Sequence, residues 1–237
     1  MSDVFIFSKF NGDISSWNMS SVTNMSYMFY NARKFNQPLN FDTSKVTSIE
    51  GMFCSAEKFN QPLNFDTSNV TSMTSMFAYA KKFNQNISSW NICNVTSLES
   101  MFFNAESFNQ EINWNTSKVT NMSEMFSFAK EFNKPLNNWN VSNVTNMDYM
   151  FYSAKNFNQN ISSWDISNVI NMVSMFYGTR EFNQNISNWN LENIEDLNEI
   201  FEEAKAFIKK YNSDKPLPED TKEIKNWFNL NRERMNM

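Results

Sequence analysis

The sequence predicts an α/β repeat solenoid in which each coil of 24 or 25 residues contains one short parallel strand and one short helix. Three observations support this fold class. An aromatic residue recurs eight times at that period, an apolar pair follows it at a constant distance, and all length variation falls at one point of the repeat. The recurring aromatic residues, which begin coils 1 to 8, are Trp17, Phe41, Phe65, Trp90, Trp114, Trp139, Trp164 and Trp189.

The register of the repeat is the same in every unit. Val or Ile stands five residues after the aromatic residue, from Val22 to Ile194. A Met-Phe pair begins eleven residues after it (Ile-Phe in the last unit), and another Phe follows seven residues beyond the first member of the pair. We therefore expect a buried set made of Met28, Phe29, Phe35, Val46, Met52, Phe53 and their counterparts in the other units.

A short helix is expected in the second half of each unit. Its apolar face would hold residues at i, i+3, i+4 and i+7, which in the first unit are Met25, Met28, Phe29 and Ala32. Thr23 or Asn24 would be the N-cap of this helix. Because a helix of two turns cannot bury such a stripe alone, neighbouring coils must cover it.

One short strand per coil is expected between these helices. Residues 62–65 and 86–90 are examples of short, polar stretches that are compatible with β-structure. Strands that pair in parallel about 4.8 Å apart would make eight units span roughly 40 Å. The segment between the repeat Phe and the next aromatic residue varies by one residue, so we expect a turn or a bulge there.

An Asn follows Phe10 and the repeat Phe of units 1 to 7, from Asn11 to Asn183. In stacked coils these side chains can form hydrogen bonds along the axis and satisfy the backbone of the turns. We interpret the column as a structural ladder. Ligand or calcium binding is the alternative, but it needs clustered carboxylates or Gly-rich turns, and the sequence has neither.

Composition argues against several classes of function. The net charge is −5, which argues against a partner nucleic acid and an anionic membrane surface. The sequence has no His, which removes His-based triads and imidazole metal ligands. Cys54 and Cys93 stand at unrelated points of the repeat and are interpreted as free thiols. We expect no enzyme activity, cofactor or metal.

The apolar run Val4–Phe7 is too short for a signal-peptide core or a membrane span, so either the native chain lacks an export signal or this sequence begins after it.

The phrase in residues 157–169, FNQNISSWDISNV, and that in residues 146–155, NMDYMFYSAK, resemble the BspA-type leucine-rich repeats of bacterial surface proteins. Related arrays occur in protist and giant-virus proteins. The resemblance covers about residues 10 to 207. It implies a leucine-rich-repeat-like solenoid that acts in adhesion or protein binding at a cell surface, outside the cell or on a virion, and it implies no catalytic residues.

The two ends of the array differ from its middle. Residues 1–16 are expected to form an incomplete first repeat, residues 17–203 the eight-repeat solenoid and residues 204–237 a helical C-terminal cap. Counting back from Phe10 places the Met-Phe columns at Asp3 and Val4. The segment that follows either covers the first coil or leaves an edge open to another chain, which would allow self-association.

The C-terminal tail is rich in charged residues from Glu192 onward. A helix is expected to begin near Pro218 and to present Ile224, Trp227 and Phe228 on one face. We interpret this helix as the cap over the last coil. A partner-binding helical hairpin is the alternative.

The candidate binding residues are aromatic side chains outside the predicted core. Their columns also hold Ser, Asn, Gly and Cys, so packing does not require aromatic residues there, and exposed aromatic residues are typical of contact surfaces. Shielding between adjacent coils is the alternative. The candidates are Tyr27, Tyr30, Tyr79, Phe103, Phe128, Tyr149, Tyr152 and Tyr177.

Two classes of function remain. The first is a scaffold that binds a protein or glycan on one face without inserting into a membrane, and the second is an architectural subunit of a surface layer or virion. Catalysis by Asp42 and Asp66, which would stack one coil apart, is a weaker hypothesis. Neighbouring units carry Asn at that position, so turn formation by the side chain explains these residues better.

Overall fold

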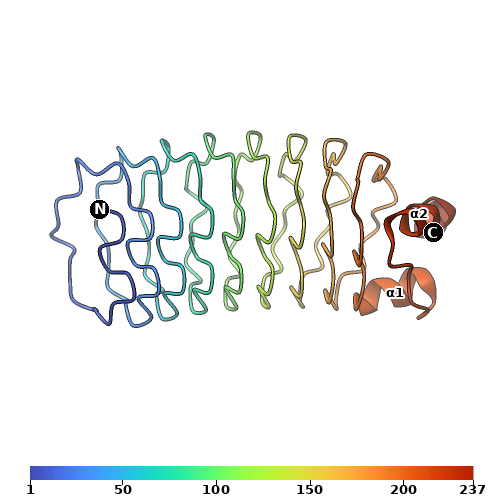
Figure 1. Ribbon diagram of the computed structural model, residues 1–237, viewed down its shortest axis with the longest axis horizontal. Coiled ribbons are helices and arrows are strands. Elements are labelled where there is room, and N and C mark those ends of the chain that lie inside the picture. The colour runs from blue at the N-terminus through green and yellow to red at the C-terminus, as the bar shows by residue number, and fades with distance from the viewer. Residues whose placement is uncertain (237) are drawn as a thin grey trace.

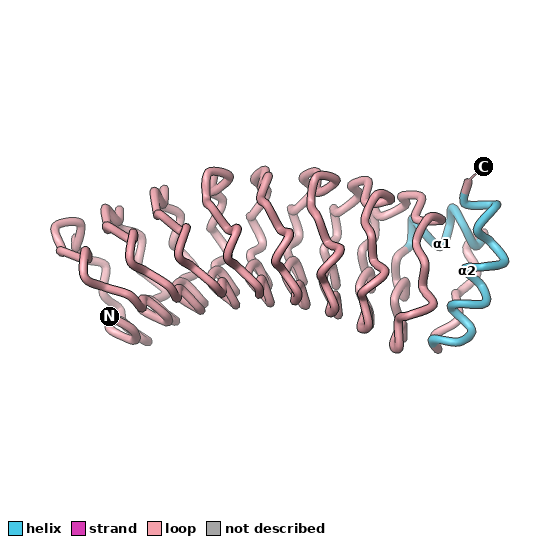
Figure 2. Tube along the Cα trace, turned by 90° about the horizontal axis from the view of Figure 1, so that it is seen from above, coloured by secondary structure: helices cyan, strands magenta, loops and turns pink. Residues whose placement is uncertain are grey.

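The computed structural model describes residues 1–236, which form a stack of coils with two helices at its C-terminal end (Figure 1). Successive coils lie side by side along the long axis, and the two termini lie at opposite ends of the stack (Figure 2). The prediction of a tandem-repeat chain is therefore confirmed. Met237, the last residue of the expected cap, lies outside the described residues.

The prediction of one helix per coil is wrong. The helices of residues 1–236 are α1 (Lys205–Asn212) and α2 (Thr221–Met235), and both follow the repeats. In coil 1, Tyr27 and Asn31 have φ angles of 56° and 55°, a left-handed conformation that a right-handed helix does not contain. The equivalent two positions have positive φ in every coil, ending with Glu199 and Glu203 in coil 8.

Hydrogen bonds between coils replace the bonds of the expected helix. The backbone N–H groups of Tyr27 and Phe29 donate to the carbonyls of Glu50 and Met52 in the next coil, at 2.8 and 2.9 Å. The intervening N–H of Met28 donates to the carbonyl of Met25, three residues earlier, at 3.2 Å. Inward-facing residues therefore recur at i, i+3, i+4 and i+7 without a helix, which is why the apolar pattern indicated one.

The predicted strand is wrong in both position and extent. Parallel pairing is limited to seven single-residue bridges, which run from Asn24↔Ser48 to Asn171↔Asp196. At the first bridge, the N–H of Thr47 donates to the carbonyl of Thr23 at 2.8 Å. The expected strand segments, residues 62–65 and 86–90, form no bridge in the described part of the chain. The coils therefore lack the strand-and-helix composition of an α/β fold.

Of the turn or bulge expected at the point of length variation, the structure contains a turn. In the units with the longer gap, the N–H of the Trp donates to the carbonyl three residues earlier, as from Trp90 to Ile87 at 3.2 Å. Among residues 1–236, no such bond is donated by the backbone N–H groups of Phe41, Phe65 or Trp114, which follow the shorter gap. The extra residue is thus accommodated in a local turn that leaves the rest of the coil unchanged.

The core consists of columns of identical or similar apolar side chains, as the register predicts, although Val22, the first member of the Val column, is only partly buried. Met28, Phe29, Phe35, Val46, Met52 and Phe53 are all fully buried. Phe126 is representative, because its ring stacks on Phe132 of its own coil at 3.9 Å and on the rings of Phe102 and Phe151 in the adjacent coils at 5.6 and 5.7 Å. From Trp90 onward, the Trp residues that begin the coils also donate hydrogen bonds across the stack, as from Trp139 Nε1 to the carbonyl of Ile112 at 2.9 Å.

The Asn ladder is confirmed, with backbone groups as its donors. Asn109 Oδ1 accepts the N–H of Asn133 in the next coil at 3.0 Å, and the N–H of Asn109 donates to Asn84 Oδ1 at 2.9 Å. The same bond links the Asn column from Asn11 to Asn183. Each Asn from Asn11 to Asn158 therefore satisfies a backbone donor that faces the neighbouring coil.

The N-terminal segment continues the stack with a register that differs by one residue from the expected one. The N–H groups of Asp3, Phe5 and Phe7 donate to the carbonyls of Ser26, Met28 and Tyr30, at 3.2, 2.9 and 2.9 Å. Phe5, rather than Val4, takes the place of the repeat Phe, because its ring stacks on Phe29 at 5.3 Å. The segment covers the first coil, and Val4 and Phe7 remain exposed.

The helical tail packs on the last coil. Helix α2 begins at Thr221 rather than near Pro218, because Asp220 is the N-cap and its carboxylate accepts the N–H of Glu223 at 3.0 Å. Ile224 and Phe228 are buried, and Trp227 packs against the core and donates from Nε1 to Asn212 Oδ1 at 3.0 Å. The residues expected on the apolar face of the cap thus contact the core.

Candidate binding surface

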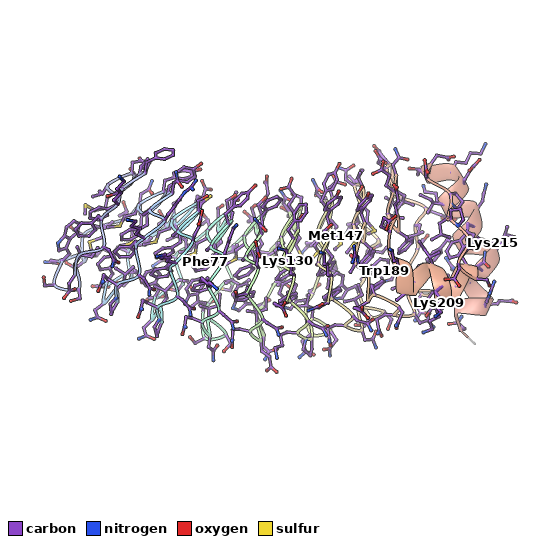
Figure 3. The ribbon with its side chains drawn as sticks, turned by 90° about the horizontal axis from the view of Figure 1, so that it is seen from below. Phe77, Lys130, Met147, Trp189, Lys209 and Lys215 are labelled. Carbon is purple, nitrogen blue, oxygen red and sulfur yellow. The ribbon has the colours of Figure 1, made fainter. Side chains whose placement is uncertain are left out.

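All eight candidate aromatic residues are exposed or half-buried. They come from the turns that flank the buried Phe column, where the backbone alternates between inward and outward positions. Figure 3 labels Phe77 and Met147, which are buried in the core of the stack, and Lys209 and Lys215, which belong to the helical tail. The repeat therefore presents these aromatic residues at regular intervals along one edge of the coils.

Six of the candidates form one continuous surface, the aromatic stripe. Its members are Tyr79, Phe103, Phe128, Tyr149, Tyr152 and Tyr177. From coil 3 to coil 7, successive ring centroids of Tyr79, Phe103, Phe128, Tyr152 and Tyr177 lie 5.1, 5.6, 5.2 and 4.7 Å apart. The ring of Tyr149 lies 5.9 Å from that of Tyr152. Neighbouring coils thus bring together residues that are about 25 positions apart in the sequence.

The other two candidates lie apart from the stripe. Tyr27 and Tyr30 contact each other edge to face at 6.0 Å, and Tyr30 also contacts Phe7 at 5.5 Å. Cys54 holds the equivalent column in coil 2 and interrupts the series. Sequence reasoning did not select Phe7 as a site residue, although its side chain is the most exposed aromatic ring of the N-terminal cluster, at 65%.

A groove of about 360 Å³ lies along the stripe in coils 4 to 8. Aromatic rings, hydroxyl groups and two carboxylates line it. The lining residues are Phe103, Glu124, Ser127, Phe128, Tyr149, Tyr152, Ser174 and Glu199. Sequence reasoning missed the two Glu residues, although they occupy the same column as Tyr27 and Tyr149.

The charged groups that line the groove are both acidic. Glu124 Oε2 accepts a hydrogen bond from Ser100 Oγ at 3.2 Å, and Glu199 Oε2 accepts one from Ser174 Oγ at the same distance. No Lys or Arg in residues 1–236 forms an ion pair with either carboxylate. Desolvation, followed by the negative charges of Asp148, Glu199, Asp196 and Glu124, raises the pKa of Tyr149. The surface beside the stripe is therefore electrostatically negative.

The remaining sequence candidates have structural roles. Asp42 and Asp66 accept the N–H groups of Ser44 and Ser68 at 3.0 and 2.9 Å, the side-chain turn that was expected. The hydrogen bonds from these serines lower the pKa of both carboxyl groups. Cys54 and Cys93 are free thiols. Within residues 1–236 no group of three His, Cys, Asp or Glu side chains is arranged to hold a metal ion.

Comparison with protein families places the chain. The family model described as "Mycoplasma protein of unknown function, DUF285" matches residues 1–61, 39–113 and 110–214. The chain belongs to the DUF285 family. Three successive matches of one model agree with the tandem DUF285 coils seen in the structure. No curated protein matches the chain. Neither α1 nor α2, the helices of residues 1–236, has the length and apolar character needed to cross a bilayer.

Proposed function

We propose that this DUF285 chain is a non-enzymatic binding scaffold whose aromatic stripe contacts a protein or glycan partner. The observation that carries the proposal is the unbroken series of accessible rings beside a groove, from Tyr79 to Tyr177. A Tyr ring offers a large apolar surface with a polar tip and has two side-chain torsions to immobilise. Rings at regular spacing allow several weak contacts to act together on one extended partner.

The backbone of the repeat gives no reason for aromatic residues at four of the eight candidate positions, three of which belong to the stripe. Those with left-handed φ are Tyr27 (56°), Tyr79 (58°), Phe128 (58°) and Tyr149 (56°). Bulky side chains are uncommon in this region, which glycine adopts without cost. Gly51 and Gly178 occupy the same two columns in other coils. Contact with a partner supplies a reason that local conformation does not.

The resemblance to BspA-type leucine-rich repeats supports the same proposal. It favours a role in adhesion or recognition at a cell surface, outside the cell or on a virion. The coils do not have the strand and helix that this resemblance implies. The resemblance therefore supports a binding role for the array and not a leucine-rich-repeat geometry within each coil.

The experiment is selection of ligands by the intact protein from a random peptide library and a glycan array. Selection is repeated with two variants, Tyr149→Ser/Tyr152→Ser in the stripe and Asn113→Ser/Asn138→Ser away from it. We expect some ligands to bind the wild type and the second variant but not the stripe variant. Thermal unfolding of all three proteins should be similar. Ligands that bind the stripe variant equally well would contradict the proposal.

An architectural subunit that assembles through its ends is the second candidate. The N–H groups of the Met-to-Ala segment of each coil donate to the next coil, so this segment has an acceptor edge and a donor edge. In residues 1–236 the carbonyls of Val4 and Ile6 accept no backbone hydrogen bond, and the side chains of Val4 and Phe7 are exposed. Sedimentation of the intact chain at increasing concentration tests this candidate. The candidate requires that reversible oligomers form as the concentration rises.

A further inference from the structure

We infer that the occupant of the stripe is a basic, extended peptide segment whose Lys and Arg side chains lie over the exposed rings and pair with Glu124 and Glu199. The inference rests on the proposed function of the stripe as a binding surface and specifies the chemistry of its partner. Charge complementarity, ring geometry and the continuity of two grooves support it.

The charge of the surface favours a cationic partner over a neutral or acidic one. Each of the two groove carboxylates accepts one Ser hydroxyl through Oε2, and neither is paired with a Lys or Arg of residues 1–236. Asp148, also on this edge, is half-buried, and Asp196 is one of the charges that act on it. An arriving guanidinium or ammonium group would find acceptors whose charge is not already neutralised.

The rings beside these carboxylates add a second attraction for the same groups. A cation within about 6 Å of the face of an aromatic ring is stabilised by the quadrupole of the ring. Tyr149 and Tyr152 line the groove and lie edge to face, and Tyr177 stacks on Tyr152 beside the groove. A Lys or Arg stem can lie along such rings while its charged end reaches Glu124 or Glu199.

A second groove extends the acidic surface towards the helical tail. It measures about 420 Å³ and lies between coil 8 and the segment that joins α1 to α2. Glu199 lines both grooves, and Glu202, Glu203, Asp214 and Glu219 line the second one with a single Lys, Lys205. Lys205 Nζ is 3.8 Å from Glu203 Oε2, so this cation is already paired. An extended basic segment can therefore follow a continuous negative path from coil 5 to the tail.

The basic side chains of the repeats lie outside these two grooves. Lys81 and Lys130 pair with Glu106 at 3.6 and 2.9 Å, in the column that follows the buried Ala. Lys155 and Arg180 belong to the same column, and neither lines either groove. Within residues 1–236, basic side chains of the repeats therefore do not neutralise the carboxylates that line the two grooves.

The test uses the full chain and defined probes. Labelled peptides of about twelve residues, long enough to cover both grooves, alternate Ser with Arg, Gln or Glu, and chitohexaose represents a glycan. Binding is measured by fluorescence anisotropy for the peptides and by calorimetry for the sugar. The variants are Glu124→Gln/Glu199→Gln, which removes charge, and Tyr149→Ser/Tyr152→Ser, which removes rings. Glu111→Gln/Glu192→Gln is the matched control, because it removes two exposed carboxylates that line neither groove.

We expect the Arg peptide to bind best, and its affinity to fall about tenfold in the charge variant and about fivefold in the ring variant at low salt. The control should stay within about twofold of wild type, and raising NaCl from about 50 to about 300 mM should weaken the wild type most. Equal binding of the Gln or Glu peptide, an unaffected charge variant, or no Arg-peptide binding up to about 1 mM would overturn the inference. The proposed function would survive if binding of chitohexaose or of library ligands still required the rings. Both the inference and the proposed function would fail if the ring variant bound every ligand as tightly as the wild type does.

Discussion

Thr221 Oγ1 accepts the backbone N–H of Leu197 at 2.8 Å, and so takes the place of the carbonyl that a further coil would provide. In coil 7 the equivalent N–H, that of Met172, donates to the carbonyl of Asp196 at 3.1 Å. The carbonyl of Glu219 likewise accepts the N–H of Glu199 at 3.2 Å. The entry into α2 therefore supplies acceptors for two of the four N–H groups of coil 8 that would donate to a further coil.

Deleting residues 212–237 should convert the chain from a capped stack into one that associates head to tail. The deletion leaves the N–H groups of Leu197 and Glu199 without acceptors and uncovers the apolar face under Ile224 and Phe228. Light scattering should show oligomers that grow with concentration, and thermal stability should fall. Phe228→Asp in the full-length chain is a matched variant that loosens α2 without removing it. A truncated chain that stays monomeric and equally stable would show that the tail is not a cap.

Phe126→Ala should destabilise the protein by about 3–5 kcal/mol, because the ring is fully buried and stacks within and between coils. The control is Phe128→Asn, two residues away on the exposed stripe at φ 58°, where Asn is well tolerated and a change below about 1 kcal/mol is expected. Urea unfolding measures both. Similar costs for the two variants would refute the assignment of inward and outward columns.

Asn109→Ala should cost about 1–3 kcal/mol, because the N–H of Asn133 loses its acceptor inside the stack. The control Asn113→Ala removes an exposed amide that makes no hydrogen bond within residues 1–236. Urea unfolding of the two variants compares the ladder with an ordinary surface Asn. Hydrogen exchange at Asn133 should accelerate in the first variant alone. Equal stability of the two variants would mean that the ladder contributes nothing.

Gly51→Ala should destabilise coil 2 and displace Tyr27. An added Cβ would lie 2.5 Å from both Cδ1 and Cε1 of the Tyr27 ring, and Gly51 has φ +56°. We expect the free energy of unfolding to fall by about 1 kcal/mol or more. The double variant Gly51→Ala/Tyr27→Ser should recover the part of this loss that is due to the clash with the ring. Thermal unfolding of the double-mutant cycle separates the two contributions. Full additivity of the two substitutions would show that Tyr27 does not lie over Gly51.

Asp66→Asn should leave stability near neutral pH almost unchanged and make it less sensitive to acid. Hydrogen bonds from Ser68 hold the pKa of the Asp66 carboxyl below its ordinary value of 3.8. A folded-state pKa below the unfolded one stabilises the protein above the unfolded pKa, and this contribution is lost as pH falls through the folded pKa. Asn makes the same turn without titrating, as Asn140 does with Ser142 at 3.0 Å. Between about pH 7 and about pH 2, the thermal midpoint should fall less steeply with decreasing pH in the variant than in the wild type. A large loss at pH 7 would contradict a purely turn-forming role.

The binding surface was only partly predictable. The eight aromatic candidates were visible because their columns tolerate small residues elsewhere, and six of them do form one surface. Glu124 and Glu199 were not selected, because isolated acidic residues in a sequence are usually solvated and their place beside Tyr149 and Tyr152 depends on the stacking of coils.

The sequence by itself determined the period, the register, the buried columns and the Asn ladder, since each depends on a residue type that recurs at a fixed distance. It also determined the turn at Trp90, since the gap before the aromatic residue varies by one residue. Only the tertiary structure decided how the segment from Met25 to Ala32 folds. The spacing of its apolar residues suits a helix and an alternating run of turns equally well. The choice depends on whether the N–H of Phe29 finds its acceptor within the coil or in Met52 of the next one. In a stack of identical coils the neighbouring carbonyl lies at 2.9 Å, and the hydrogen bond between coils replaces the helix.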